Sequence, residues 1–420
     1  MRMQPVREKS QNPAGSRQST AVFWINPLKP LTSGGSNICR ALYSCLTTDA
    51  VMRPIGPHTS QVLNVARAVA AGLVVLFHAA IYTRGNIPVK PADNLLYILT
   101  ECGTQAVFWF FVISGYLVGG SVISEIVRTG NFNFRRYFVN RMTRLYVVLL
   151  PALALGAILD RTRISAWGIN SHAGYETVSS LSGVTLLQNV FFLQTLTGPT
   201  FGSNYALWSL ASEFWYYTIF PLMLSPIMIK RATYIRFMLF MIGILLILFI
   251  TKHNVSMSWL FTLWFLGAAI RCVGATGRKF EILAWVVAIL GMLAFPYLHS
   301  RVGPLATILV GVTFAGTILS THGQPGKGSK RCIRIANAFS GLSFSLYLIH
   351  LPILHFVTTL IARNADPFLN ITPHSIVSPA VIVGLVCVSY TAAFLFARIT
   401  EDHTDAVRRS LWRIPSASLN

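Results

Sequence analysis

An arginine and a histidine stand eleven positions apart in one apolar segment of the chain. Residues 67–80 read RAVAAGLVVLFHAA, with Arg67 at the start and His78 near the end. Eleven residues of α-helix turn through roughly 1100°, about 20° beyond three full turns, and advance roughly 16 Å. The two side chains therefore share one helix face at different depths. Because a titratable group in hydrocarbon usually faces the bundle interior or a water-filled cavity, the pair is a candidate site for acid–base chemistry.

Two further segments carry polar groups within or beside apolar stretches. Arg141 and Arg144 lie three residues apart in RRYFVNRMTRLYVV, so they share a helix face. They are either topology determinants that reach the lipid headgroups or paired guanidiniums that hold phosphate groups bidentately. Ser114 and Tyr116 lie among aromatic residues in VFWFFVISGYLVGG. Small residues in such a helix permit close packing, while the hydroxyls could instead line a cavity.

A carboxylate and a second histidine occur in two later apolar segments. Glu213 is the acid of YALWSLASEFWYY, where Trp208 and its aromatic neighbours fit an interfacial belt. The carboxylate either pairs with an arginine or orients a substrate hydroxyl or a catalytic histidine. Tyr347 and His350 lie in FSLYLIHLPILHF. Since His355 follows His350 by five residues, the two histidines do not share a helix face and are poor partners for a metal.

The composition of the chain is that of a polytopic membrane protein. Of 420 residues, 53% are hydrophobic and only 11% are charged, against about 25% charged residues in soluble domains. A spanning helix needs about 20 mainly apolar residues, and we predict about ten such helices in an all-α fold. Residues 180–197 are predicted as a further helix in or dipping into the interface. The predicted spans are 62–83, 95–123, 138–159, 206–228, 234–251, 256–273, 282–298, 303–321, 337–362 and 376–398.

The basic residues orient this topology. With the N- and C-termini in the cytoplasm, 26 of the 34 Lys and Arg residues fall on the inner side and seven on the outer side, while Arg67 lies within a span. This is the asymmetry of the positive-inside rule. The net charge of +21 therefore resides in short juxtamembrane clusters. Such clusters indicate contact with a lipid bilayer and argue against a nucleic-acid partner.

The chain divides into three predicted parts. Residues 1–58 are polar and basic and are expected to form a disordered tail. Residues 59–400 form the membrane domain, and residues 401–420 a cytoplasmic C-terminal tail. The six cysteines lack the spacing of a metal site or disulfide framework, and the sequence contains no P-loop, GxSxG or HExxH motif. We therefore expect no metal, and the oligomeric state is left open.

Taken in order, the motifs resemble the acyltransferase type 3 family, bacterial integral-membrane proteins that O-acylate cell-surface carbohydrates. The resemblance covers about residues 60–400. The sequence departs from the family pattern at Asn64, where an acid is frequent, at the late Pro151, and after Glu401, where the usual proline is missing. These departures bear on the subfamily and the acceptor. The matching elements are Arg67 with His78, FFVISGY at 110–116, Arg141 with Arg144, WSLASE at 208–213, and the segment with Ser345, Tyr347, Leu348 and His350.

The resemblance implies an O-acyltransferase of the bacterial inner membrane. Its donor substrate would be a cytoplasmic acyl-CoA, with acetyl-CoA expected, and its acceptor a hydroxyl of a cell-surface or exported carbohydrate. Arg141 and Arg144, with Arg67, would bind the CoA phosphates. His78 would act as general base or as transient acyl carrier, and Glu213 would orient His78 or the acceptor.

Other residues of the motifs are expected to contact substrate or line its cavity. The alternative function is a proton-linked transporter or flippase of an envelope glycan precursor, with Arg67, His78 and Glu213 as its proton pathway. In that case the RxxR arginines would serve topology alone. The expected substrate-contacting or cavity-lining residues are Ser114, Tyr116, Trp208, Ser209, Tyr347 and His350.

Overall fold

The computed structural model describes most of the predicted membrane domain. Of the predicted N-terminal tail, residues 1–53 lie outside the described ranges, as do residues 414–420 of the predicted C-terminal tail. The described ranges are residues 54–84, 101–168, 171–172, 175–273, 280–322, 330–364 and 379–413.

Long helices dominate these ranges and confirm the prediction of a helical membrane protein. A single two-residue hairpin, Ser171–His172 (β1) with Tyr175–Glu176 (β2), is the exception. The longer elements are α3 (Pro57–Arg84), α5 (Gly103–Ser114), η1 (Gly115–Gly119), α6 (Gly120–Thr129), α7 (Phe134–Trp167), α10 (Leu207–Met223), α11 (Thr233–His253), α12 (Val255–Ile270), α13 (Glu281–Val302), α14 (Pro304–Thr321), α15 (Lys330–Asn364), α16 (Pro379–Ile399) and α17 (Thr404–Arg413).

Eight helices of the described ranges are long and apolar enough to cross a membrane, two fewer than the spans predicted. The two remaining predictions, 206–228 and 256–273, correspond to α10 with 17 residues and α12 with 16 residues. Residues 201–206 form turns, so α10 begins only at Leu207. It ends at Met223, just before the short 3₁₀ helix Ser225–Ile227 (η2), which contains Pro226. The lengths of the two apolar segments in the sequence therefore overestimated the lengths of these two helices.

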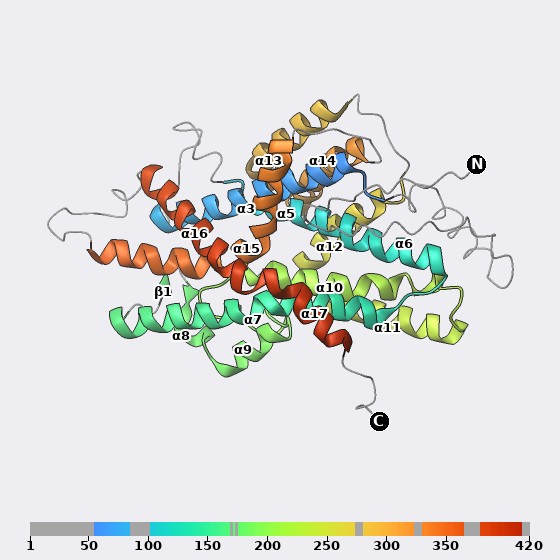
Figure 1. The fold of residues 1–420 in the computed structure, drawn as a ribbon, viewed down its shortest axis with the longest axis horizontal. Helices are drawn as coiled ribbons and strands as arrows, with labels where there is room; N and C mark the ends of the chain where they lie inside the picture. The colour runs from blue at the N-terminus through green and yellow to red at the C-terminus, as the bar shows by residue number, and fades with distance from the viewer. Residues whose placement is uncertain are drawn as a thin grey trace, which may run out of the picture. The chain divides into compact units, whose positions relative to one another are not determined.

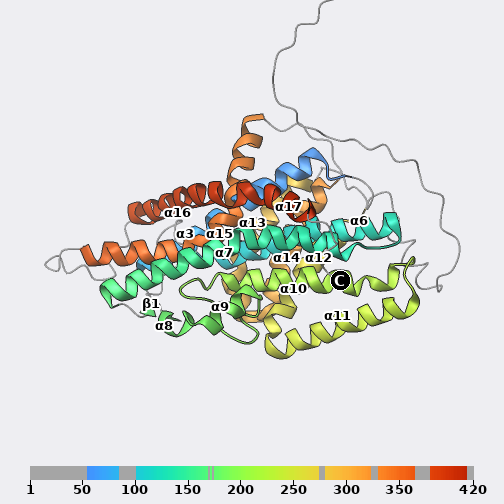
Figure 2. The same ribbon diagram turned by 60° about the horizontal axis from the view of Figure 1, so that its bottom comes forward.

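The helix α15 packs against three other long helices. These are α3, α7 and α16, and both views place α15 between α16 and α7 (Figures 1 and 2). In contrast, α11 and α13 bury little of their apolar surface. Monomeric soluble proteins rarely expose such large apolar patches. The exposed apolar residues of these two helices therefore fit a lipid-facing surface.

Close packing of glycines shapes the segment that carries Ser114. A Cβ atom at Gly115 would collide with the backbone carbonyl of Trp264 on α12, and one at Gly267 with the carbonyl of Val112 on α5. The two backbones thus approach as closely as glycine allows. At this crossing α5 passes into the π-helix η1. π-Helical turns of this kind often occur at functional sites.

The helix that carries the two neighbouring arginines has well-defined ends. The Asn133 side chain accepts a hydrogen bond from the Arg136 backbone N–H at 3.0 Å, which caps the start of α7. At the other end Gly168 adopts a left-handed conformation with φ of 65°. Arg141 and Arg144 consequently lie two to three turns inside a continuous helix rather than in a loop.

Residues 177–206 form a compact connection between α7 and α10. Within the predicted interfacial segment 180–197, the structure contains one short helix, Gly183–Val190 (α9), preceded by the single turn Thr177–Ser180 (α8). An isolated backbone bridge joins Gln194 and Gly198. The predicted helix therefore covers only part of its segment, and the rest is folded by turns.

Candidate active site

A cavity between α3, α5, α7, α10 and α15 collects most of the predicted polar residues. Its volume is about 140 Å³, well above the ~10–15 Å³ needed to hold one water. It is therefore a space for ligand or several waters rather than a packing defect. Its polar lining residues are Arg67, Ser114, Arg141, Arg144, Ser209, Glu213, Tyr217, Ser343 and Tyr347, and its apolar lining includes Phe110, Phe111, Leu145, Leu210 and Phe344.

Glu213 is held at the cavity wall by hydroxyl groups. Its Oε1 accepts hydrogen bonds from the Ser114 hydroxyl at 2.7 Å and from the Tyr217 hydroxyl. The Ser114 oxygen in turn accepts one from the Trp264 indole N–H at 3.1 Å. Among the described residues these hydroxyls, rather than an arginine, are the direct partners of Glu213. Both of these hydrogen bonds go to the same carboxylate oxygen, Oε1.

Three arginines contribute positive charge to the same cavity. Arg67 donates a hydrogen bond from Nη2 to the Ser343 hydroxyl at 3.2 Å. The Arg141 guanidinium lies 5.8 Å from the centroid of the Tyr217 ring, a cation–π distance. Arg144 is exposed at the cavity and lies near enough to Arg67 and Glu401 for their charges to interact.

Arg141 and Arg144 differ from Arg67 in their polar contacts. Within the part of the chain that the structure describes, neither guanidinium has a hydrogen-bond or ion-pair partner, although both line the cavity. A guanidinium presents five N–H donors in a planar fork that matches phosphate oxygens. The two side chains are therefore placed to bind an anionic ligand in the cavity.

Tyr347 separates this cavity from the histidines. Its hydroxyl lies 2.6 Å from the Ser209 hydroxyl and donates to the Ala206 carbonyl at 3.2 Å. On its other side, the Tyr347 ring lies 5.7 Å from the ring of His350, centroid to centroid. Tyr347 thus lines the cavity and also contacts His350, which is not among the lining residues.

His78 and His350 form a buried pair outside the cavity lining. His350 Nε2 lies 3.1 Å from His78 Nδ1, and the exposed fractions of the two residues are 0% and 8%. The Tyr205 ring covers His78 from α10's preceding turn, with the ring centroids 5.4 Å apart. Glu213 was predicted to orient either His78 or the acceptor. The side chain that contacts the His78 ring nitrogen is His350 from α15, and Glu213 instead lines the cavity.

The other two predicted lining residues also lie away from the cavity. The Tyr116 hydroxyl hydrogen-bonds His322 Nδ1 at 2.7 Å, and its ring lies beneath the Arg271 guanidinium at 5.4 Å. Trp208 packs its ring near Phe111, with centroids 6.2 Å apart. Tyr116 follows Ser114 by two residues, which is roughly 200° around a helix, so the two side chains leave the helix on different sides.

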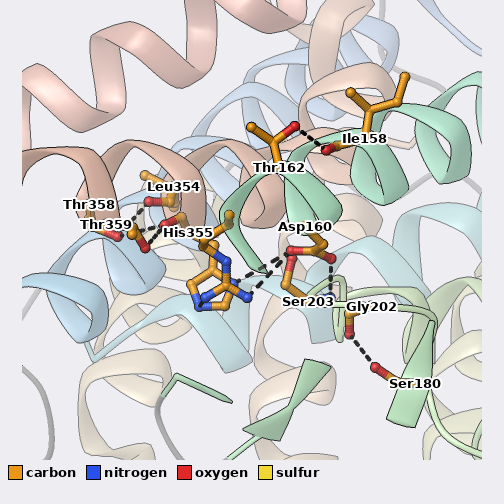
Figure 3. A network of polar contacts seen from close by, with 11 residues as sticks. Ile158, Asp160, Thr162, Ser180, Gly202, Ser203, Leu354, His355, Thr358 and Thr359 are labelled. Carbon is orange, nitrogen blue, oxygen red and sulfur yellow. Dashed lines mark hydrogen bonds and ion pairs between the residues drawn. The ribbon is translucent and has the colours of Figure 1, made fainter. Parts of the chain in front are cut away.

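A second polar cluster connects α7 with α15 and the 177–206 connection. Asp160 and Arg163 form an ion pair of 3.7 Å and are almost fully buried. Arg163 Nη1 donates to His355 Nε2 at 2.8 Å, and Asp160 Oδ2 accepts from the Ser203 backbone N–H at 2.8 Å. Asp160 and His355 face each other from two helices, with Ser203 alongside (Figure 3). We assign this cluster a structural role, because its charged groups contact one another.

Several residues of the cavity were not singled out from the sequence. Ser343 is the partner of Arg67, and Tyr217 that of Glu213. Helical spacing offered a signal for Tyr217, since it lies one turn after Glu213 on the same helix. No comparable signal exists for Ser343, because its contact with Arg67 spans two helices that are far apart in sequence. Among the described residues, no group of three or more His, Cys, Asp or Glu is arranged to hold a metal ion.

The comparisons with known proteins agree with this arrangement of motifs. A family profile described as an acyltransferase domain (Acyl_transf_3) matches residues 61–398, which include every candidate residue above. An uncharacterized protein of Haemophilus influenzae is 32% identical over 119 residues, which are 27% of this chain and 46% of that protein. The chain thus covers less than half of that relative's length. No solved structure matches the chain. Because the profile spans most of the sequence, this protein belongs to the acyltransferase type 3 family of membrane acyltransferases.

Proposed function

We propose that this acyltransferase moves an acyl group, acetyl in the first instance, from cytoplasmic acyl-CoA to a carbohydrate hydroxyl on the far side of the bacterial inner membrane. The observation that carries the proposal is the arginine-lined cavity within a family of acyltransferases. An acyl-CoA has phosphates at one end and an uncharged thioester at the other. The cavity offers guanidiniums together with an apolar lining, the two kinds of surface that such a molecule needs.

The donor half of the proposal assigns the phosphates to the arginines. Arg141 and Arg144 line the cavity without polar partners among the described residues, so a phosphate would satisfy donors that are now open. Both enter the membrane from the side that the basic residues mark as cytoplasmic, where acyl-CoA is available. Arg67 lies at the same cavity and adds a third positive charge.

The chemical half of the proposal assigns the proton transfer to His78. On α3 it lies roughly 16 Å further along the axis than Arg67, towards the side expected to face the carbohydrate. Tyr347 lies between the cavity and His350, so its side chain would have to move aside for the thioester to reach His78. His78 would then remove the proton of the attacking hydroxyl as general base. An acyl-imidazole intermediate on His78 is the other chemically balanced route.

Glu213 and Ser114 take supporting roles in this proposal. The Ser114 hydroxyl hydrogen is engaged by the carboxylate, so it is not available to stabilise an oxyanion. We assign the pair to shaping and polarising the cavity around the donor. The proposed acceptor is an alcohol group of a carbohydrate.

Transfer by membranes that contain the His78→Ala variant tests the proposal. Membranes are incubated with radiolabelled acetyl-CoA and extracted envelope polysaccharide, and label in the polysaccharide is counted. General-base catalysis contributes about 10²- to 10⁴-fold, so His78→Ala should lower transfer by at least about 100-fold at equal protein level in the membrane. The matched control is His403→Ala, which removes an exposed histidine and should leave transfer unchanged.

Two outcomes would refute the proposal. Near-normal transfer by His78→Ala would remove His78 from the reaction. Absence of transfer by the wild-type protein across polysaccharide, lipopolysaccharide and lipid-linked oligosaccharide acceptors, together with export of a labelled glycan precursor, would favour the transporter alternative.

A further inference from the structure

We infer that His350 is a positioning residue that fixes the tautomer of His78 and leaves His78 Nε2 as the basic nitrogen. The inference rests on the proposed function for its catalytic meaning, but the tautomer itself follows from hydrogen bonding. It assigns to His350 a role that the sequence motif alone did not, since the motif suggested only contact with substrate or cavity.

The backbone of α15 determines which nitrogen of His350 carries the proton. His350 Nδ1 lies 3.1 Å from the Leu346 carbonyl oxygen and 2.8 Å from the Tyr347 carbonyl oxygen. Carbonyl oxygens only accept hydrogen bonds, so Nδ1 must be the donor. In a neutral imidazole the other nitrogen is then an acceptor. His350 therefore presents the lone pair of Nε2 towards α3.

The protonation of His78 follows from that of His350. The atom facing His350 Nε2 is His78 Nδ1, at 3.1 Å. Because two lone pairs repel, His78 Nδ1 must carry the hydrogen in this contact.

The remaining nitrogen of His78 is thereby defined as the reactive one. Nε2 holds the lone pair, and the ring is enclosed by Phe77, Tyr205 and His350, with centroid distances of 4.9, 5.4 and 5.0 Å. Since both histidines are at least nine-tenths buried, water can hardly replace the lost hydrogen bond if His350 is removed. The pair thus resembles other arrangements in which one side chain orients a basic imidazole through its second nitrogen.

The reaction balances with this tautomer. His78 Nε2 takes the proton from the carbohydrate hydroxyl as its oxygen attacks the thioester carbon. The C–O bond forms, the C–S bond breaks, and the electron pair leaves with sulfur. The thiolate then takes the proton from His78 Nε2, which yields the ester and free CoA thiol. Throughout, the Nδ1 hydrogen stays on His78 and donates to His350, and this bond strengthens while the ring is transiently cationic.

Two variants at His350 separate the positioning role from simple packing. His350→Leu removes the acceptor and should lower kcat by about 10- to 100-fold, the range expected when a buried hydrogen bond is left unmade. His350→Gln can offer its side-chain oxygen at the former position of Nε2 and should recover most of that loss. The KM for acetyl-CoA should change by less than about twofold in both variants, because the effect lies on the chemical step.

A spectroscopic measurement decides the tautomer without depending on activity. The wild-type protein is labelled with ¹⁵N-histidine, and the ring signals of His78 are assigned by their loss in His78→Ala. The expected result is a hydrogen on Nδ1 and an unprotonated Nε2 at neutral pH. In His350→Leu the Nε2–H tautomer should gain population, while His350→Gln should restore the wild-type signals.

The outcomes distinguish the role of His350 from the role of His78. Finding the Nε2–H tautomer in the wild-type protein, or equal kcat for the Leu and Gln variants, would overturn the positioning role of His350. Full activity of His78→Ala would instead overturn the proposed function, and the tautomer measurement would still stand as a test of the hydrogen-bond geometry.

Discussion

Replacing Arg144 with alanine provides the sharpest test of how the donor is bound. The guanidinium lines the cavity and has no polar partner among the described residues, so its removal should break few internal contacts. A hydrogen bond to a charged group contributes about 1.5–3 kcal/mol, and each 1.4 kcal/mol corresponds to about a tenfold change in affinity. The Kd for acetyl-CoA should therefore rise by about 10- to 150-fold in Arg144→Ala.

Equilibrium binding of labelled acetyl-CoA to the purified protein in lipid nanodiscs measures this Kd. Arg144→Lys retains the positive charge but loses the planar fork, so its Kd should lie between those of the wild type and Arg144→Ala. Arg161→Ala is the matched control, because Arg161 is an exposed residue on the same helix, about 25 Å further along its axis. Its Kd should equal that of the wild type.

The choice of ligand shows whether a phosphate is the group recognised. Binding of acetyl-dephospho-CoA, which lacks the 3′-phosphate, is measured beside acetyl-CoA for each protein. If Arg144 contacts that phosphate, the wild type should discriminate between the ligands and Arg144→Ala should not. A Kd within about twofold of wild type for Arg144→Ala, with both ligands, would refute the assignment of this arginine to the donor.

Two further predictions concern the carboxylates. Glu213→Gln retains an oxygen for Ser114 and Tyr217 but loses the charge. The kcat for acetyl transfer should therefore fall by about 10-fold or more, while the melting temperature stays unchanged. A kcat equal to that of the wild type would show that the charge has no role. Asp160→Asn leaves the buried Arg163 without its counter-charge; breaking such a pair costs about 3–5 kcal/mol, so the melting temperature in detergent should fall clearly. The control for stability is Asp402→Asn, which disrupts an exposed ion pair expected to contribute at most about 1 kcal/mol. Equal melting temperatures for Asp160→Asn and Asp402→Asn would contradict the structural role of Asp160.

The sequence by itself determined the class of the protein and much of its local structure. Apolar segments of sufficient length predicted the long helices, because a helix in lipid must satisfy its own backbone hydrogen bonds. Helical periodicity placed Arg67 and His78 on one face of α3, and the structure points both towards α15. The ordered motifs predicted the family, which the profile match confirms.

Tertiary structure decided which side chains meet across helices. Periodicity relates residues on one helix, but the rotation and depth of a second helix depend on packing that no local pattern records. The partners of Arg67 and His78, Ser343 and His350, therefore became known only from the fold. The same holds for the hydrogen bond between Tyr116 and His322, which joins residues far apart in the sequence.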